Sequence, residues 1–538
     1  MAILIRERQP PWNGPFITEI KPTNPNLLRH LDDLILKAQT VLKDNVFVSK
    51  SGNDNGYTAA SGKKLIAGKT EPRFLYPFQW LWDTFFISAW NDNVGQSSAD
   101  ISKFFAGQTS DGFLGHIRYN RSALSDYFPG PSLLYYDNHL PETGEITSKI
   151  TQPPNAAYGV LETANKLPRA DRLKLLQEYY PKLFKYHRYI YENLFIDNKF
   201  IIIHPWQNGD DNSPKWDSIY EAFHDNSVLK QEIKSWYQEH GKINGFDPKL
   251  PLDENSIFTF VKTWLESNGV AYERIDTKLI PPNQRPTGNH YDKYLLLMFL
   301  YSRWGWDYKK ILDQSPYKVA DPLSNAILLR SDLALLDIAK QLGKTEDSKT
   351  IENWITSSKA GLESLWDNQE KLYFAKNISD GKLIKVKTTS SFAPLFSRAI
   401  PYMRASQLAD QLFKTMLQAP QTYLVPSSFP IVEADRYWRG SVWPVVNTLI
   451  IEGLIYYGHE KLAAKIMADT ISMIDKDDVE GGFHEYYRAK KEGQGLKSNS
   501  TGLGSPRQSW TAAAILKITD MIRQSKSLSQ LVSSYLNK

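Results

Sequence analysis

Apolar residues recur at intervals of three and four positions along most of this 538-residue chain. That spacing places them on one face of an α-helix. It predicts long helices at 26–42, 170–194, 290–306, 324–343, 348–366, 405–417, 446–474 with a break near Gly458, and 508–522. Shorter helices are expected at 79–93, 97–107 and 155–166. The total of about twelve, joined by short turns, predicts an all-α protein built as an (α/α)6 barrel of paired antiparallel helices.

Strand patterns are few and local. The segments 45–50 and 371–386 predict β-hairpins, the second with an Asp-Gly turn. The sequence lacks both βαβ alternation and a glycine-rich phosphate loop, which disfavours a Rossmann or P-loop protein.

No Pro/Gly/Ser-rich linker divides the chain. We expect an N-terminal helix and hairpin (1–75) packed on the barrel (76–525), followed by a C-terminal helix (526–538). The segment 218–284 is more polar and only partly helical, which predicts an insertion or lid. An ordinary peripheral subdomain is an equal alternative for it.

Composition excludes several classes of protein. With 64 basic and 59 acidic side chains, a net charge of +5 and no basic stripe, neither nucleic acid nor a membrane is an expected partner. The absence of cysteine excludes disulfides, thiolate metal ligands and cysteine nucleophiles. The ten histidines lack metal-ligand spacing, so we expect no metal and no cofactor.

Hydropathy bears on location. The first apolar run is too short for a signal peptide, and no run approaches the ~20 apolar residues of a membrane span. We therefore expect a cytoplasmic protein, and a homo-oligomer is compatible with the sequence.

Seven of the fifteen tryptophans lie in segments that combine aromatic with charged and turn residues. These segments, with one that lacks tryptophan, are PFQWLWDTFF (77–86), WQNGDDNSPKWD (206–217), YWRGSVWP (437–444), GGFHEYY (481–487) and SPRQSWTAAA (505–514). Indole faces stack on sugar rings, and carboxylates bind sugar hydroxyls, so the combination favours a carbohydrate site. Aromatic stripes are more often core. Here the charged Asp83 and Arg439 interrupt them, which favours a ligand.

Two of these segments carry candidate catalytic carboxyls. The run Asn-Gly-Asp-Asp-Asn-Ser-Pro predicts a tight loop, and Trp206 and Trp216 on either side would desolvate a carboxyl, as a general acid requires. An Asx-turn or a cation-binding loop is the alternative.

Glu485 is the second candidate and follows two glycines; the alternative is an ordinary surface glutamate. The polar stretch after it, up to residue 506, predicts a loop over a cleft. Two carboxyls across a sugar-sized cleft imply glycoside hydrolysis.

Nine segments resemble, in order from about residue 75 to 520, glycoside hydrolase family 63, and most closely its bacterial mannosylglycerate and glucosylglycerate hydrolase branch. They are YPFQWLWDTFF, DGFLGHI, TQPPNAAYG, WQNGDDNSPKWD, RPTGNHYDKYL, DPLSNAILLRSDLALLDIA, YWRGSVWPVVN, GFHEYY and SWTAAAI. The resemblance implies an (α/α)6 barrel and an inverting mechanism on a small glycoside and water, with Asp211 as general acid and Glu485 as general base.

The resemblance also implies two sets of substrate-binding residues. Those expected around the sugar are Tyr76, Trp80, Trp82, Asp83, Trp206, Gly209, Trp438, Gly440 and Trp443. Those expected around glycerate are Tyr127, Gln152, Arg285, Tyr291 and Tyr437. An arginine fork suits a small carboxylate, because it can donate two parallel hydrogen bonds.

The sequence departs from the family pattern in two places. The family loop commonly reads Ser-Gly-x-Asp-Asn-Ser-Pro, whereas this chain has Asp210 at the x position, so Asp210 competes with Asp211 as proton donor, and the motif register favours Asp211. The stretch between Asp217 and Arg285 is expanded, which allows a larger or different aglycone. A trehalase-like or oligosaccharide α-glucosidase, a non-hydrolytic sugar-binding (α/α)6 protein and a helical scaffold are the alternative functions.

Overall fold

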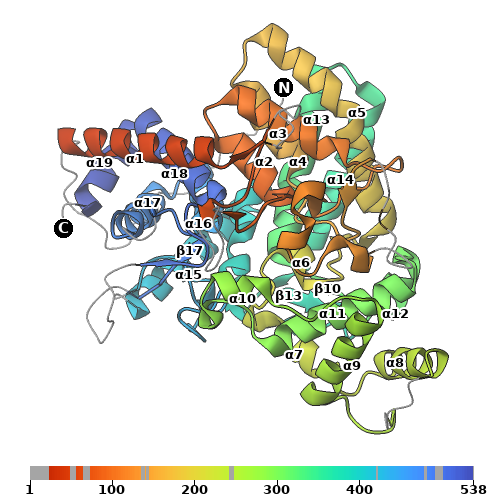
Figure 1. The fold of residues 1–538 in the computed structure, drawn as a ribbon. Helices are drawn as coiled ribbons and strands as arrows, with labels where there is room; N and C mark the ends of the chain where they lie inside the picture. The colour runs from red at the N-terminus through yellow and green to blue at the C-terminus, as the bar shows by residue number, and fades with distance from the viewer. Residues whose placement is uncertain are drawn as a thin grey trace.

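Paired helices make up most of the computed structural model (Figure 1). It describes residues 24–48, 56–64, 73–134, 140, 144–241, 247–419, 422–477, 481–490 and 501–536. The predicted loop over the cleft falls largely on 491–500, outside these residues.

Six helical elements contact one another in a closed ring. In order they are α2 (Leu81–Trp90), α4 (Ala156–Asn165), α13 (Pro322–Gln341), the 3-10 helix η7 (Ala393–Ser397), α16 (Pro444–Tyr456) and α18 (Ser509–Gln524). An outer helix follows each of them: α3 (Val94–Ala106), α5 (Arg169–Asn193), α14 (Thr345–Glu363), α15 (Tyr402–Gln418), α17 (Glu460–Asp475) and α19 (Lys526–Leu536). α1 (Pro25–Asp44) also packs on α18. This is the (α/α)6 barrel that the helical periodicity predicts.

Burial separates the inner from the outer helices. All ten residues of α2 are buried, as are the residues from Pro444 to Leu454 in α16, so these helices are surrounded by other elements. In α1, by contrast, the buried residues fall on one stripe from Leu27 to Leu42. The predicted break near Gly458 is confirmed, because Gly458 adopts a φ of +83° between α16 and α17.

Short antiparallel strands connect the helices. Two three-stranded sheets are β5 (Gln79–Trp80), β6 (Ile117–Tyr119), β7 (Ile146–Thr147), and β10 (Val319–Ala320), β13 (Ala375–Asn377), β14 (Leu383–Ile384). The two-stranded ribbons are β1 (Val46–Phe47)–β2 (Tyr57–Thr58), β3 (Lys63–Lys64)–β4 (Arg73–Phe74), β8 (Phe195–Ile196)–β9 (Lys199–Phe200), β11 (Trp366–Asp367)–β12 (Leu372–Tyr373), β15 (Lys387–Thr388)–β16 (Ser428–Phe429) and β17 (Tyr486–Tyr487)–β18 (Gly502–Leu503). The predicted Asp-Gly turn joins β13 to β14, with Gly381 at a φ of +72°.

The chain between α5 and α13 leaves the ring and forms a separate helical group (lower right in Figure 1). Its helices are α6 (Pro205–Asn208), α7 (Asp217–Glu221), α8 (Ser227–Glu239), α9 (Glu254–Ser267), α10 (Ile275–Leu279), α11 (Gly288–Arg303) and α12 (Tyr308–Gln314). Short 3-10 turns complete the chain: η1 (Arg121–Asp126), η2 (Pro131–Leu134), η4 (Pro214–Trp216), η5 (Pro282–Gln284) and η6 (Thr389–Ser391). None of the helices in the described ranges is long and apolar enough to cross a membrane.

Candidate active site

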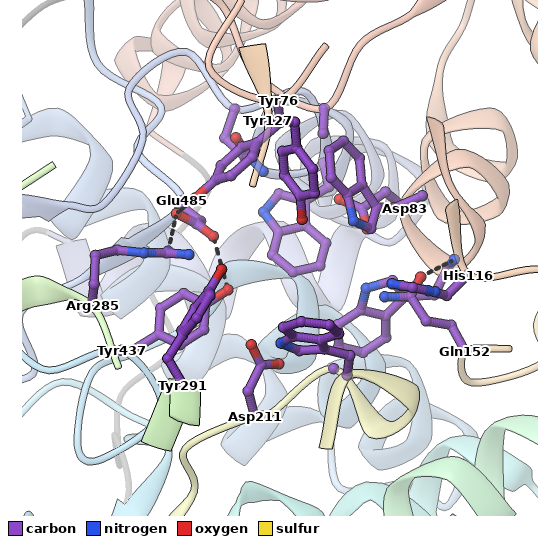
Figure 2. A pocket seen from close by; sticks show the side chains of 17 residues that line it. Tyr76, Asp83, His116, Tyr127, Gln152, Asp211, Arg285, Tyr291, Tyr437 and Glu485 are labelled. Atoms are coloured by element: carbon purple, nitrogen blue, oxygen red, sulfur yellow. Dashed lines mark hydrogen bonds and ion pairs between the residues drawn. The ribbon is translucent and has the colours of Figure 1, made fainter. Parts of the chain in front are cut away.

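A cavity lies where the inner helices begin (Figure 2). Its lining comes from the segments that precede or start α2, α4, α16 and α18, and from the chain between α5 and α13. The lining residues are Ala60, Tyr76, Trp80, Trp82, Asp83, His116, Tyr127, Gln152, Trp206, Gly209, Asp211, Arg285, Tyr291, Tyr437, Glu485, Gln508 and Trp510. The fold therefore gathers every predicted site residue here except Trp438, Gly440 and Trp443.

Glu485 faces the cavity from the segment just before β17 and is surrounded by hydrogen-bond donors. Ser505 N–H donates to its Oε2 at 3.2 Å, and the Tyr437 hydroxyl donates to Oε1 at 3.3 Å. Tyr76 Oη and Arg285 Nη1 each lie 3.5 Å from Oε2. Burial raises the pKa of Glu485, and Arg285 and these hydrogen bonds oppose that rise. The donors favour the ionised form, which a general base needs.

Asp211 faces the same cavity from the opposite side (Figure 2). No side chain of the described residues hydrogen-bonds to its carboxyl group, although its backbone carbonyl accepts from Tyr220 at 3.0 Å. Burial raises the pKa of Asp211 well above its ordinary value; the charges of Asp210 and Glu485 raise it too, and Arg285 opposes them. This setting favours the protonated form of the carboxyl group, which a general acid needs.

Asp210 points away from the cavity into a buried charge cluster. Its Oδ2 lies 2.6 Å from Lys215 Nζ, and the same ammonium lies 2.6 Å from Asp321 Oδ2 and 2.5 Å from Ser390 Oγ. Asn208 donates to Asp210 Oδ1 at 2.6 Å. Burial raises the pKa of Asp210 to about 6, against the opposing charge of Lys215. These contacts anchor the loop through Asp210. Of the two neighbouring aspartates, only Asp211 lines the cavity.

Aromatic side chains make up much of the cavity lining. Trp80 packs edge-on against Tyr76 at 5.6 Å and Tyr127 at 5.9 Å between ring centroids. Gly209 ends α6 with a φ of +84°, and a Cβ there would lie 2.5 Å from the Trp82 ring. Only glycine fits this close approach of backbone to indole.

Asp83 is a third buried carboxyl at the cavity, in the first turn of α2. Burial raises its pKa well above the ordinary value, and the charge of Glu485 acts in the same direction. The Gln152 side-chain oxygen Oε1 accepts a hydrogen bond from the backbone N–H of Trp82 at 3.3 Å. The Asp83 and Gln152 side chains both place polar atoms at the cavity.

Trp438 and Trp443 lie behind the cavity wall. Their rings stack on each other at 3.7 Å and are 1% and 0% exposed, and Trp438 packs on Trp82 at 6.4 Å. Gly440, with a φ of +153°, has Ile431 as its nearest neighbour. Of the segment 437–444, only Tyr437 lines the cavity. Trp438 packs against Trp82, and Trp443 packs against Trp438.

Two expectations about charged and aromatic neighbours are corrected. Arg439 does not line the cavity. It donates to both Asp217 carboxylate oxygens at 2.9 Å and to the Asn212 carbonyl at 3.2 Å. These contacts brace the loop that carries Asp210 and Asp211. Trp216 is fully buried, and its indole N–H donates to the Asp210 carbonyl at 3.1 Å. Of the two tryptophans beside the loop, only Trp206 lines the cavity.

Arg285 and three tyrosines, Tyr76, Tyr291 and Tyr437, line one end of the cavity, which we call the acid-binding end after its predicted role. The guanidinium lies over the Tyr437 ring at 4.3 Å and the Tyr76 ring at 5.9 Å. Its Nε donates to Asp276 at 3.2 Å. Tyr291 stands beside it, with its hydroxyl 3.4 Å from the Phe128 carbonyl. Arg285 Nη1 lies 3.5 Å from Glu485 Oε2, and Nη2 makes no hydrogen bond with a described residue. A buried guanidinium at a cavity suits a carboxylate ligand.

Four lining residues were not predicted. His116 stacks on Trp206 at 6.3 Å, its Nδ1 lies 2.5 Å from Ser148 Oγ, and burial lowers its pKa to about 3, so it is neutral. The Trp510 indole N–H is buried without a hydrogen-bond partner among the described residues. Both lie in segments with a family signal, DGFLGHI and SWTAAAI; Ala60 and Gln508 complete the set. Across the described residues, no group of three histidine or acidic side chains is placed to hold a metal ion.

Comparisons with known proteins agree with this geometry. A family model described as the mannosylglycerate hydrolase MGH1-like glycoside hydrolase domain matches residues 76–511. The mannosylglycerate hydrolase of Thermus thermophilus is 35% identical over 451 residues, 82% of this chain and 94% of that protein. The glucosylglycerate hydrolase of Mycolicibacterium hassiacum is 26% identical over 481 residues, 85% of this chain and 94% of that protein.

A solved structure is similar along nearly the whole chain. It is the glycoside hydrolase family 63 mannosylglycerate hydrolase from a second strain of Thermus thermophilus, in complex with Tris and D-glycerate. The TM-score is 0.69 at 33% identity, with 90% of this chain and 99% of that chain covered. This similarity confirms the predicted (α/α)6 fold.

Proposed function

This chain belongs to the mannosylglycerate hydrolase MGH1-like family of glycoside hydrolases, and we propose that it releases a hexose from a small α-glycoside of glycerate with inversion. Glucosylglycerate and mannosylglycerate are the proposed substrates. One observation carries the proposal: two buried carboxyls face one cavity in opposite settings. Glu485 has four donors around it, whereas Asp211 has none from the described side chains.

The two settings support a different role for each carboxyl group. Asp211, protonated, gives its proton to the glycosidic oxygen as the bond between that oxygen and the anomeric carbon breaks. Glu485, ionised, takes a proton from a water molecule whose oxygen bonds to the anomeric carbon from the other face. The products are glycerate and the inverted hexose, and proton exchange with solvent restores both carboxyls.

The remaining lining residues fit the two parts of the proposed substrate. Trp80, Trp206 and Trp510 offer aromatic faces and indole N–H groups to a hexose, with Asp83 for its hydroxyls. Arg285 and Tyr291 offer a cation and a hydroxyl to the glycerate carboxylate. Glucose and mannose differ at one hydroxyl, so both epimers remain in the proposal. Cytoplasmic location stays a prediction from the hydropathy of the sequence.

A substrate panel tests the proposal. The kcat/KM values of purified protein are compared for glucosylglycerate, mannosylglycerate, trehalose, kojibiose and nigerose. We expect one of the two glycerate glycosides to exceed every neutral disaccharide. Preference for trehalose or another neutral disaccharide would instead assign the barrel to a trehalase-like or oligosaccharide α-glucosidase activity.

A further inference from the structure

Asp276 lies between two guanidinium groups at the acid-binding end of the cavity. Its carboxylate accepts from Arg274 Nε and Nη2, both at 2.7 Å, and from Arg285 Nε at 3.2 Å. Burial opposes ionisation of Asp276, but the two guanidiniums outweigh it, so the pKa of Asp276 lies below its ordinary value. The ionised carboxylate thus occupies the Nε of Arg285.

Asp276 belongs to α10, which stands directly behind the acid-binding end. A second, small cavity lies beside them, and its lining includes Ile275, Asp276, Leu279 and Ile280 of this segment. Its lining also includes residues shared with the main cavity: Tyr76, Tyr127, Arg285 and Tyr291. The segment 218–284, which the sequence predicts as an insertion or lid, therefore contacts residues that line the proposed site for the substrate carboxylate.

The segment around α10 is fixed to its surroundings by charged and polar contacts. The Arg274 guanidinium stacks on the Tyr291 ring at 3.6 Å and donates to the Pro286 carbonyl at 3.1 Å. Arg436 donates to the Arg285 carbonyl at 2.8 Å. Gln284 accepts from Gly504 N–H at 2.8 Å, beside the segment that carries the base. These contacts leave little freedom for the Arg285 backbone.

We propose that Asp276 is a positioning residue for Arg285, so that this arm of the segment 218–284 completes the site for the substrate carboxylate. By engaging Nε, Asp276 keeps Nη1 and Nη2 on the side of the cavity, where Nη1 also lies 3.5 Å from Glu485 Oε2. Arg274 fixes Asp276 in turn. A bidentate contact depends on this orientation, because two parallel hydrogen bonds require a guanidinium plane held in place. The inference rests on the proposed function of the cavity.

Positioning and simple charge make opposite predictions for loss of Asp276. If only charge mattered, removing an anion 3.2 Å from Arg285 would strengthen the attraction for an anionic aglycone. If Asp276 orients the guanidinium, its removal weakens binding of that aglycone and leaves a neutral aglycone unaffected. The sign of the change in KM therefore distinguishes the two.

The test compares two substrates that differ at one group. Glucosylglycerate carries a carboxylate where glucosylglycerol carries a hydroxymethyl group. Both are assayed with the wild type, Asp276→Asn, Arg274→Lys, and Glu273→Gln as the matched control. Glu273 precedes Arg274, is about half exposed and pairs with Lys278 rather than with the Arg285 cluster. Arg274→Lys keeps the charge but loses the fork, so it tests the same claim without altering Asp276.

For Asp276→Asn and Arg274→Lys we expect a KM for glucosylglycerate raised about tenfold or more, with kcat/KM for glucosylglycerol within about threefold of wild type and Glu273→Gln unchanged. Equal losses on both substrates, or a lower KM for glucosylglycerate, would overturn the positioning role. Absence of a carboxylate preference in the wild type would show instead that the proposed function has failed. The two failures are thus distinguishable.

Discussion

Arg285 holds its Nη1 3.5 Å from Oε2 of Glu485, so the proposed ligand for the substrate carboxylate also touches the proposed base. The same guanidinium lowers the pKa of Glu485 and of Asp211 against the effect of burial. In the proposed mechanism, substrate binding and proton transfer are therefore linked through one side chain. Arg285 and the two proposed catalytic carboxyls form one electrostatic unit.

This contact gives a signed prediction for Arg285→Gln. Loss of the cation raises the pKa of both carboxyls. The base must be ionised and the acid must be protonated, so both limbs of the pH profile of kcat move to higher pH. The profile is measured with an aryl glucoside, whose binding does not need the cation. An acidic limb that stays in place would contradict the contact between Arg285 and the base.

The two carboxyls should respond differently to the leaving group. Asp211→Asn removes proton donation and lowers kcat on a glycerate glycoside by about 10²–10⁴-fold. It should remain active on a glycosyl fluoride, which leaves without protonation. Glu485→Gln should lose both substrates. Near-normal turnover of the glycerate glycoside by Asp211→Asn would remove it as the acid.

The buried charge cluster of Asp210, Lys215 and Asp321 should contribute strongly to stability. Lys215→Met leaves Asp210 and Asp321 buried without their shared cation, which should lower the free energy of unfolding by about 3–5 kcal/mol. Lys385→Met is the control, because Lys385 is half exposed where it pairs with Asp367, and it should cost at most about 1 kcal/mol. Urea unfolding measures both, and equal losses would show that burial adds nothing here.

Gly209 should be intolerant of a side chain for two reasons. Gly209→Ala places a Cβ at a φ of +84° and 2.5 Å from the Trp82 ring. Gly343→Ala is the matched control, with a φ of +68° and no atom within 4 Å of its Cβ. Both variants carry backbone strain, but only Gly209→Ala should also raise KM by displacing Trp82. Similar KM values for the two variants would argue against a tight fit between Gly209 and Trp82.

Helical periodicity predicted most helices of the barrel, because a long helix that is buried on one face shows apolar residues at regular three- and four-residue intervals. It missed η7, whose five residues are too few to show any period. Motif register placed Asp211 and Glu485 at the cavity, since each loop carries its carboxyl at a fixed offset. It did not separate Tyr437, which lines the cavity, from Trp438 and Trp443 behind it. Aromatic composition does not encode which layer a ring occupies.

Other parts of the site depend on contacts that the local sequence pattern does not reveal. His116 becomes a lining residue through Ser148 and Trp206, which have no sequence relation to it. Asp276 lies in a five-residue helix within a polar segment, where nothing in the local pattern distinguishes it from a surface acid. Only the fold brings it to Arg285. The sequence predicted an insertion but did not indicate what that insertion contacts.

The stereochemistry of the released sugar tests the central claim most directly. The purified protein is incubated with glucosylglycerate, mannosylglycerate and trehalose, and the first anomer released is followed by proton NMR before mutarotation. We predict the β-hexose first, together with one equivalent of glycerate, from an α-linked glycerate glycoside. Release of the α-hexose first, or cleavage of trehalose while both glycerate glycosides remain intact, would contradict the account.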